Sequence, residues 1–166
     1  MMFEKFGEFD SWEEINQAAE IKFNQGDMEA VRTIAAENGI DKEDAEDFID
    51  GVLEELTTAV QAAVGKLNME CEDLKLKGVL LDWADELKAL CVQDNDFALA
   101  VRKKGKDLAG FIAKTADSGY EHRAVVDRRI VEKTEQVKKI IGNHEFSIGI
   151  PDKKTRLEIA LKHYLG

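Results

Sequence analysis

Residues 41–67 have the sequence DKEDAEDFIDGVLEELTTAVQAAVGKL. Its apolar residues recur every three or four positions, the spacing of one face of a helix. Asp41 stands where an N-cap is expected, and Gly51 would weaken a helix by about 1 kcal/mol. The pattern predicts one long helix at the centre of the core. Its inward-facing residues are Ala45, Phe48, Ile49, Val52, Leu56, Val60, Ala63 and Val64.

Two shorter helices are predicted before this stretch. Ser11 and Glu14 have the spacing of a capping box, and an apolar stripe follows until Gly26 ends the helix. Asp27 begins the next helix, and Gly39 supplies the turn after it, because glycine adopts a left-handed backbone at no steric cost. The N-terminal part of the chain is therefore predicted to be entirely helical.

Helices also dominate the remainder of the chain. A polar bend is expected at residues 68–77, followed by a helix with Trp83 and Leu87 inward. Residues 125–141 are predicted to form another helix, and residues 145–150 alternate like a strand or half of a small hairpin. Further helices are expected after Asp94, Gly105 and Pro151. The predicted fold is an all-α bundle of about seven helices with at most a short hairpin near residues 145–150.

Charge is distributed very unevenly along the chain. Residues 1–96 carry 25 acidic and 8 basic side chains, whereas residues 97–166 carry 9 and 15, within a net charge of −11. Such asymmetry concerns partners more than fold. We expect an acidic helical unit at residues 1–67 and a basic helical unit at residues 78–166, with one compact domain as the alternative.

Several functional classes find no support in the sequence. There is no apolar run long enough for a membrane span and no secretion-signal layout at the N-terminus, so we expect a cytoplasmic protein without membrane contact. Cys71 and Cys91 are isolated and are expected to be buried thiols. Motifs for catalysis, phosphate binding or metal binding are missing around His122, His144 and His163. We expect no enzyme activity, no catalytic residue, no metal and no cofactor.

The segment around Gly39 has the spacing of a helix-turn-helix, with Ala35 before the turn and Ala45 and Phe48 after it. A DNA-reading version would need basic or amide side chains at the start of its second helix, but this helix starts with carboxylates, which repel phosphate. The carboxylates form either a solvated face or a surface that imitates nucleic acid in a basic groove. The candidate partner-binding residues are Asp41, Glu43, Asp44, Asp47 and Asp50.

Basic side chains cluster in the C-terminal part. They could be an ordinary charged surface, contact a nucleic acid backbone, or contact an acidic partner such as the acidic half of a second copy, which would make a homodimer. Tyr120 is the one clear aromatic candidate for stacking on bases, which disfavours sequence-specific RNA recognition. The candidate basic surface consists of Arg102, Lys103, Lys104, Lys106, Arg128 and Arg129.

Three segments carry a family resemblance: LDWADELKALCVQDNDFALAVRKKGKDLAGFIAK at residues 81–114, VDRRIVEK at 126–133 and ALKHYLG at 160–166. Their layout resembles that of PcfK-like proteins of conjugative elements and of related small type II anti-CRISPR proteins. Family members tend to end in consecutive tyrosines, but here His163 precedes Tyr164. The resemblance implies a mobile-element or phage protein that acts by binding, with an RNA-guided nuclease as a candidate partner, and it supplies no catalytic residues.

Three functional hypotheses remain open at this stage. The first is a non-catalytic inhibitor of a nucleic-acid enzyme that uses the acidic, nucleic-acid-mimicking surface. The second is an accessory nucleic-acid-binding protein of a conjugative element that uses the basic C-terminal half. The third is a structural, self-associating module.

Overall fold

The computed structural model describes residues 2–166 and confirms an all-α protein with one very short two-stranded ladder. Ten helices are present in this part of the chain, and two of them have only four and six residues. The elements are α1 (Trp12–Asn24), α2 (Met28–Glu37), α3 (Lys42–Ile49), α4 (Ala59–Asp73), α5 (Val79–Gln93), α6 (Asn95–Arg102), α7 (Leu108–Glu121), β1 (Ala124–Val125), α8 (Arg128–Val131), α9 (Gln136–Ile141), β2 (Ser147–Ile148) and α10 (Lys153–Leu165).

Most helices begin where the sequence supplies a capping side chain. Ser11 Oγ accepts a hydrogen bond from the Glu14 amide at the start of α1, and Asp27 does the same for Ala30 in α2. These caps satisfy backbone N–H groups that have no partner within the helix. Asp94, Asp107 and Asp152 cap α6, α7 and α10 in the same way.

The single long helix predicted for residues 41–67 is wrong, because the chain forms two helices there. α3 ends at Ile49, Gly51 adopts a left-handed backbone at φ 75°, and α4 starts only after Thr58. Thr58 and Gln61 form a reciprocal capping box, which fixes the new start. α4 then continues to Asp73, through most of the segment expected to bend.

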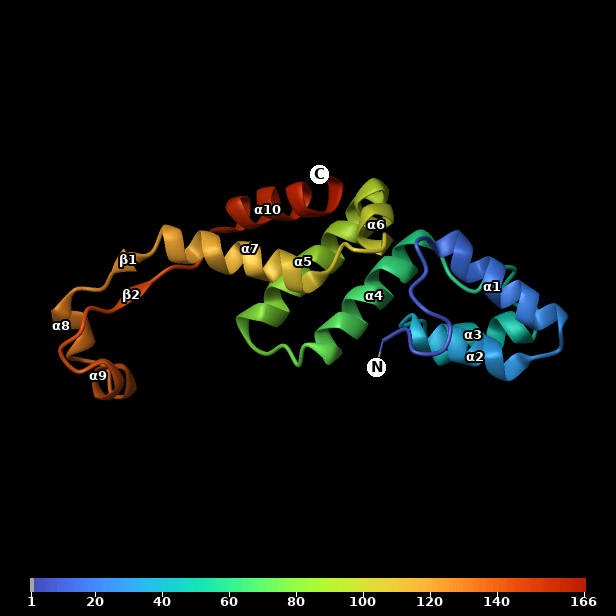
Figure 1. Ribbon diagram of the computed structural model, residues 1–166, viewed down its shortest axis with the longest axis horizontal. Helices are drawn as coiled ribbons and strands as arrows, with labels where there is room; N and C mark the ends of the chain where they lie inside the picture. Colours follow the sequence, from blue (N-terminus) through green and yellow to red (C-terminus); the bar gives the residue numbers. More distant parts are fainter. Residues whose placement is uncertain (1) are drawn as a thin grey trace.

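The core consists of two hydrophobic clusters, and the helices that form them follow one another along the long axis of the molecule (Figure 1). The first is formed by α1, α2, α3 and the segment before α4, and we call residues 2–57 the N-terminal lobe. The second is formed by α4, α5, α6, α7 and α10, which we call the body. Ala62 belongs to the first cluster and Ala63 to the second, so α4 contributes to both. Whether the two units fold independently stays a prediction.

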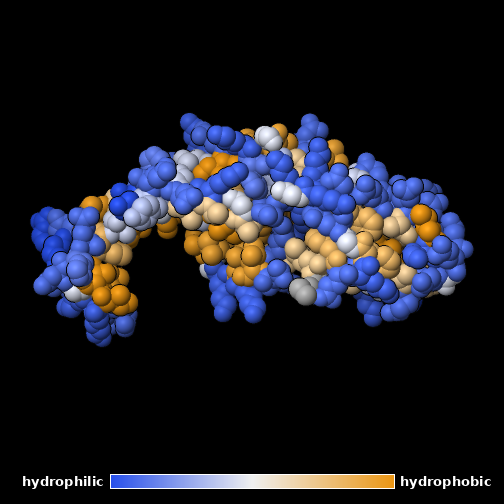
Figure 2. Space-filling model, in the orientation of Figure 1, coloured by the Kyte–Doolittle hydropathy of each residue, from blue (hydrophilic) through white to orange (hydrophobic). Residues whose placement is uncertain are grey.

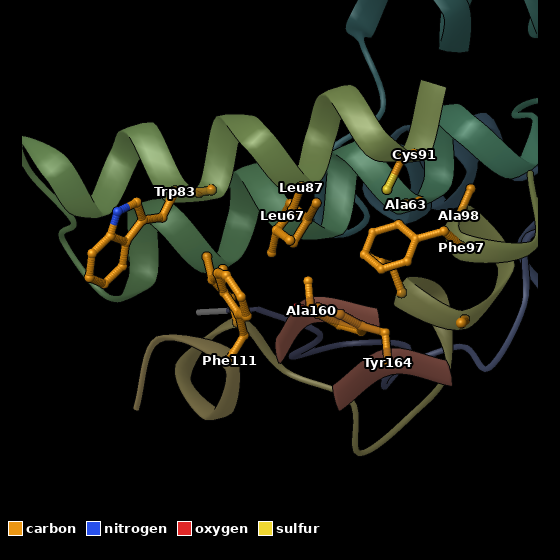
Figure 3. Close-up of a cluster of buried hydrophobic side chains, with 14 of the residues drawn as sticks. Ala63, Leu67, Trp83, Leu87, Cys91, Phe97, Ala98, Phe111, Ala160 and Tyr164 are labelled. Carbon is orange, nitrogen blue, oxygen red and sulfur yellow. The ribbon is translucent and has the colours of Figure 1, made fainter. Parts of the chain in front are cut away.

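The core of the body is built from aromatic and aliphatic residues of five helices (Figure 3). Phe97 of α6 and Tyr164 of α10 meet edge to face, with 5.3 Å between ring centroids. Leu67 of α4, Leu87 of α5 and Phe111 of α7 complete this contact region (Figure 3). The core joins helices that are far apart in the sequence. It therefore holds α10, the last helix of the chain, against the other helices of the body.

The N-terminal lobe and the body touch through two glycines. A Cβ on Gly65 of α4 would lie 2.3 Å from the Asn38 carbonyl oxygen, and a Cβ on Gly39 would lie 2.4 Å from the Gly65 carbonyl oxygen. Gly39 also has φ 67°, as expected for the turn after α2. The missing side chains therefore let the α2–α3 turn rest directly on α4.

Residues 122–150 leave the body as a separate protrusion, which we call the arm (Figure 1). The single helix predicted over residues 125–141 is wrong: this segment holds β1 and the short helices α8 and α9. The hairpin expected near residues 145–150 is present, because β2 pairs antiparallel with β1, with Ala124 opposite Ile148. At the base of the arm, a Cβ on Gly119 would lie 2.3 Å from the Gly149 carbonyl oxygen, so both strands leave the body together.

Candidate functional site

The acidic residues predicted as a partner site lie on and beside α3. Glu43, Asp47 and Asp50 follow i, i+4, i+7 spacing and therefore share one stripe of the helix. Asp44 lies next to this stripe and accepts a hydrogen bond from Gln61 Nε2 at 3.1 Å. Asp41 precedes the helix, and its side chain makes no capping hydrogen bond. Ala45 and Phe48 on the opposite face are buried, so the structure brings the carboxylates together on the outside of the lobe.

Charge on the α3 face is largely uncompensated. Within residues 2–166, no ion pair involves any of the five predicted carboxylates. Glu46 differs, because Arg32 of α2 donates to both its oxygens at 2.7 and 2.9 Å. These hydrogen bonds lower the pKa of Glu46. The α3 face, which we define as Asp41, Glu43, Asp44, Asp47 and Asp50, remains negatively charged.

The acidic face belongs to a lobe that is acidic as a whole. Residues 1–57 carry 17 acidic side chains and 4 basic ones, whereas residues 58–166 carry 17 and 19. The negative charge of the chain is thus concentrated in its first third. A field of one sign over a lobe of this size attracts cationic surfaces and repels nucleic acid.

A hollow of about 820 Å³ opens on the same lobe, between α1 and the segment joining α3 to α4. Trp12, Phe23, Phe48 and Leu53 contribute its apolar lining. None of the five carboxylates of the α3 face lines it. Its charged lining residues are all glutamates, and we call it the acidic hollow: Glu13, Glu20, Glu54 and Glu55.

A second hollow, of about 430 Å³, lies on the body between α5 and α10. Arg156 crosses its rim and donates to both oxygens of Glu86, at 2.9 and 2.5 Å. The arginine lowers the pKa of the Glu86 carboxyl mainly through these hydrogen bonds. Because this hollow contains paired charges of both signs, it offers no clear preference for a charged ligand.

The predicted basic surface does not form. Arg102 is 1% exposed and donates from Nη2 to Asn38 Oδ1 at 2.7 Å, so this side chain cannot reach a phosphate. Lys106 Nζ donates to the carbonyl oxygens of His163 and Gly166 at the end of α10. Lys103 and Lys104 are exposed beside these two residues. Burial and capping thus remove two of the four basic groups expected on the body.

The two arginines predicted at the other end of this surface lie on the arm, away from the body (Figure 1). Arg128 forms an ion pair with Glu132, and Arg129 binds both oxygens of Asp127 at 3.0 Å. Hydrogen bonding to Arg129 lowers the pKa of Asp127. Both arginines are therefore paired with carboxylates of the arm, and the six predicted basic residues share no single face.

Buried charges near the junction of lobe and body were missed by the sequence analysis. Lys66 of α4 is 1% exposed; its Nζ binds Glu8 Oε1 at 3.1 Å and the carbonyl oxygens of Lys103 and Lys106. Glu70, one turn further, accepts a hydrogen bond from the Leu108 amide at 3.2 Å. A signal existed, because both residues fall on the same helical face as Leu67.

Burial shifts the pKa values of two charged residues in this cluster. It raises the pKa of Glu70 to about 7 and lowers the pKa of Arg102 to about 10. Glu70 Oε2 and the Tyr164 hydroxyl are both buried without a hydrogen-bond partner among residues 2–166. The side chains of this cluster are buried and do not line the acidic hollow.

The remaining chemically active residue types are dispersed. Cys71 and Cys91 are buried free thiols, as expected, and burial raises the pKa of each; that of Cys91 reaches about 12. Among residues 2–166, no three His, Cys, Asp or Glu side chains are grouped as metal ligands would be. No helix in this part of the chain has the length and apolar character needed to cross a membrane.

No described protein family, no curated protein and no solved structure matches this chain. The geometry and charge of the N-terminal lobe are therefore the basis for a functional proposal.

Proposed function

We propose that this protein is a non-catalytic inhibitor that inserts the α3 face into the basic groove of a nucleic-acid enzyme. The observation that carries the proposal is the α3 face, whose carboxylates are exposed or half-buried and form no ion pair within residues 2–166. Such a face displaces counterions from a cationic groove as a nucleic acid does.

The dimensions of the α3 face suit this role. With a rise of about 1.5 Å per residue, Glu43 to Asp50 spans about 10 Å along the helix. One strand of duplex DNA presents a phosphate about every 3.4 Å along its axis, or roughly three over that length. Glu43, Asp47 and Asp50 thus supply a comparable row of negative charges.

The class of target follows from the resemblance to PcfK-like and anti-CRISPR proteins. An RNA-guided type II nuclease, whose guide and target nucleic acids lie in a positively charged channel, is the first enzyme to test. Such a target would place the inhibitor in the cytoplasm of a cell that carries a phage or conjugative element.

The test measures binding to, and inhibition of, a panel of purified type II nucleases, each with and without guide RNA. We expect binding that weakens as salt rises and that duplex DNA competes away. The triple variant Glu43→Gln, Asp47→Asn, Asp50→Asn should bind at least tenfold more weakly. The control Glu72→Gln, Asp73→Asn, Glu121→Gln removes three exposed charges outside the α3 face and should bind normally.

Two results would contradict the proposal. One is equal loss of binding in both triple variants, which would show a response to net charge alone. The other is salt-sensitive binding of the protein itself to duplex or single-stranded DNA in a gel-shift assay, which would support the accessory nucleic-acid-binding role. Failure against the whole panel would remove the nuclease as the target.

A further inference from the structure

The arm exposes apolar side chains that its own fold cannot cover. Among residues 122–150, all of which the structure describes, Val131 is the only buried side chain. Ile140 of α9 is 83% exposed and Ile130 of α8 is 58% exposed. Figure 2 shows this hydrophobic surface at the tip of the arm. A small ladder with two short helices has no core, and clustered exposed apolar residues mark an interaction surface.

The charge of the arm selects the kind of partner. Its segment carries six basic and four acidic side chains; Glu132 pairs with Arg128 and Asp127 with Arg129, while Glu135 and Glu145 lie outside these pairs. The lysines outside those pairs are Lys133, Lys138 and Lys139. An apolar tip flanked by lysines fits an apolar surface surrounded by carboxylates better than it fits a nucleic acid backbone.

The acidic hollow of the N-terminal lobe is an apolar surface surrounded by carboxylates. Trp12, Phe23 and Leu53 are half-buried within it, and its charged lining residues are all glutamates. The arm and the hollow therefore match in both respects, since each combines apolar surface with charge of opposite sign.

The arm cannot reach the hollow of its own chain. The two lie at opposite ends of the long axis, with the whole body between them (Figure 1). We propose that the arm of one molecule docks into the acidic hollow of a second copy of this chain. The contact joins two different surfaces, so it is heterologous, and repetition of it produces head-to-tail chains or a closed ring.

The first experiment measures molar mass by light scattering across protein concentration and ionic strength. We expect mass to rise with concentration and to fall as salt screens the lysine–glutamate contacts. Ile140→Asp on the arm and Glu20→Lys with Glu54→Lys in the hollow should each give a monomer. Val92→Asp, at an exposed α5 position outside both surfaces, and Glu72→Lys with Asp73→Lys should assemble like the wild type.

A mixture of the two defective proteins gives the decisive result. The Ile140→Asp protein keeps an intact hollow, and the hollow variant keeps an intact arm, so one interface can form between them. We expect the mixture to give dimers and nothing larger. A mixture that stays monomeric, a wild type that is monomeric at every concentration, or assembly by the Ile140→Asp protein alone would each overturn the proposal.

These measurements are independent of the nuclease assays. The substitutions in the arm and the hollow leave the α3 face intact, and the α3 triple variant leaves arm and hollow intact. Loss of self-association with normal inhibition, or the reverse, therefore shows which of the two proposals fails. Urea denaturation of each variant verifies that it is folded.

Discussion

Lys66, Glu70 and Arg102 are residue types that normally lie at the surface, yet all three are buried near the junction of lobe and body. Their partners come from distant parts of the chain: Glu8 for Lys66, the Leu108 amide for Glu70 and Asn38 for Arg102. Removing one member of such a cluster leaves a charge or polar group without compensation in a low-dielectric region. At the scale of single residues, charge therefore serves both folding and surface chemistry in this protein.

Glu70 makes stability depend on pH. Its pKa rises from 4.5 to about 7 in the folded protein, so the protonated carboxyl stabilises the fold below about pH 4.5. This contribution is lost as pH rises to about 7, because the unfolded chain then ionises more readily. The loss is on the order of 3 kcal/mol. We expect Glu70→Gln to remove most of this dependence and to unfold at higher urea than the wild type at pH 8.

The measurement is urea denaturation at a series of pH values between 4.5 and 8 for the wild type, Glu70→Gln and the exposed control Glu72→Gln. Identical pH profiles for the wild type and Glu70→Gln would show that other groups cause the dependence.

At the scale of elements, the division between α3 and α4 positions the acidic lobe. One continuous helix over residues 41–67 would carry the α3 carboxylates in line with α4, whereas the intervening segment lets α3 pack against α2 in the lobe. The local causes are Gly51 in a left-handed conformation and the Thr58–Gln61 capping box. Both signals were present in the sequence, but the apolar spacing continued through them and favoured one helix.

Thr58 is expected to stabilise the start of α4. Thr58→Ala removes the side-chain oxygen that accepts from the Gln61 amide at 3.3 Å, and we expect it to lower the free energy of unfolding by about 1 kcal/mol. Thr58→Ser should keep most of the stability. Thr33→Ala within α2 serves as the control, because alanine there gains helix propensity. Equal urea midpoints for Thr58→Ala and the wild type would contradict this account.

At the scale of the whole molecule, the structure arranges three parts along one axis. The N-terminal lobe carries the negative field, the body supplies the larger core, and the arm projects beyond it (Figure 1). No residue of the arm belongs to either hydrophobic cluster. The arm should therefore be expendable for folding even though its sequence is rich in apolar residues.

Replacing residues 124–148 by a short Gly-Ser linker tests this independence. The close approach of Gly119 and Gly149 at the base of the arm allows a short connection. We expect the free energy of unfolding to change by less than about 0.5 kcal/mol, as for surface changes that touch no core. Urea denaturation followed by circular dichroism measures it. A loss of several kcal/mol would show that the arm stabilises the body.

Interactions between residues close together in the sequence determine several features of this protein. They are the all-α class, most helix starts, the turn at Gly39 and the concentration of acidic charge in the N-terminal lobe. Periodicity, capping and glycine turns depend on residues a few positions apart, which is why they could be predicted. The α3 face was accessible to the same reasoning, because carboxylates on and directly beside one short helix remain together in any packing that buries Ala45 and Phe48.

Contacts between residues far apart in the sequence determined which charged side chains are buried and where the acidic hollow forms. Nothing near Arg102 in the sequence indicates that Asn38 will bind it, and the acidic hollow is made by α1 and a segment some thirty residues later. Arg129 meets Asp127 because α8 begins directly after Asp127, whereas the Arg128–Glu132 pair has the i, i+4 spacing that a longer helix would also provide. Burial and pairing depend on which elements meet, and that choice minimises the free energy of the whole chain rather than of any single segment.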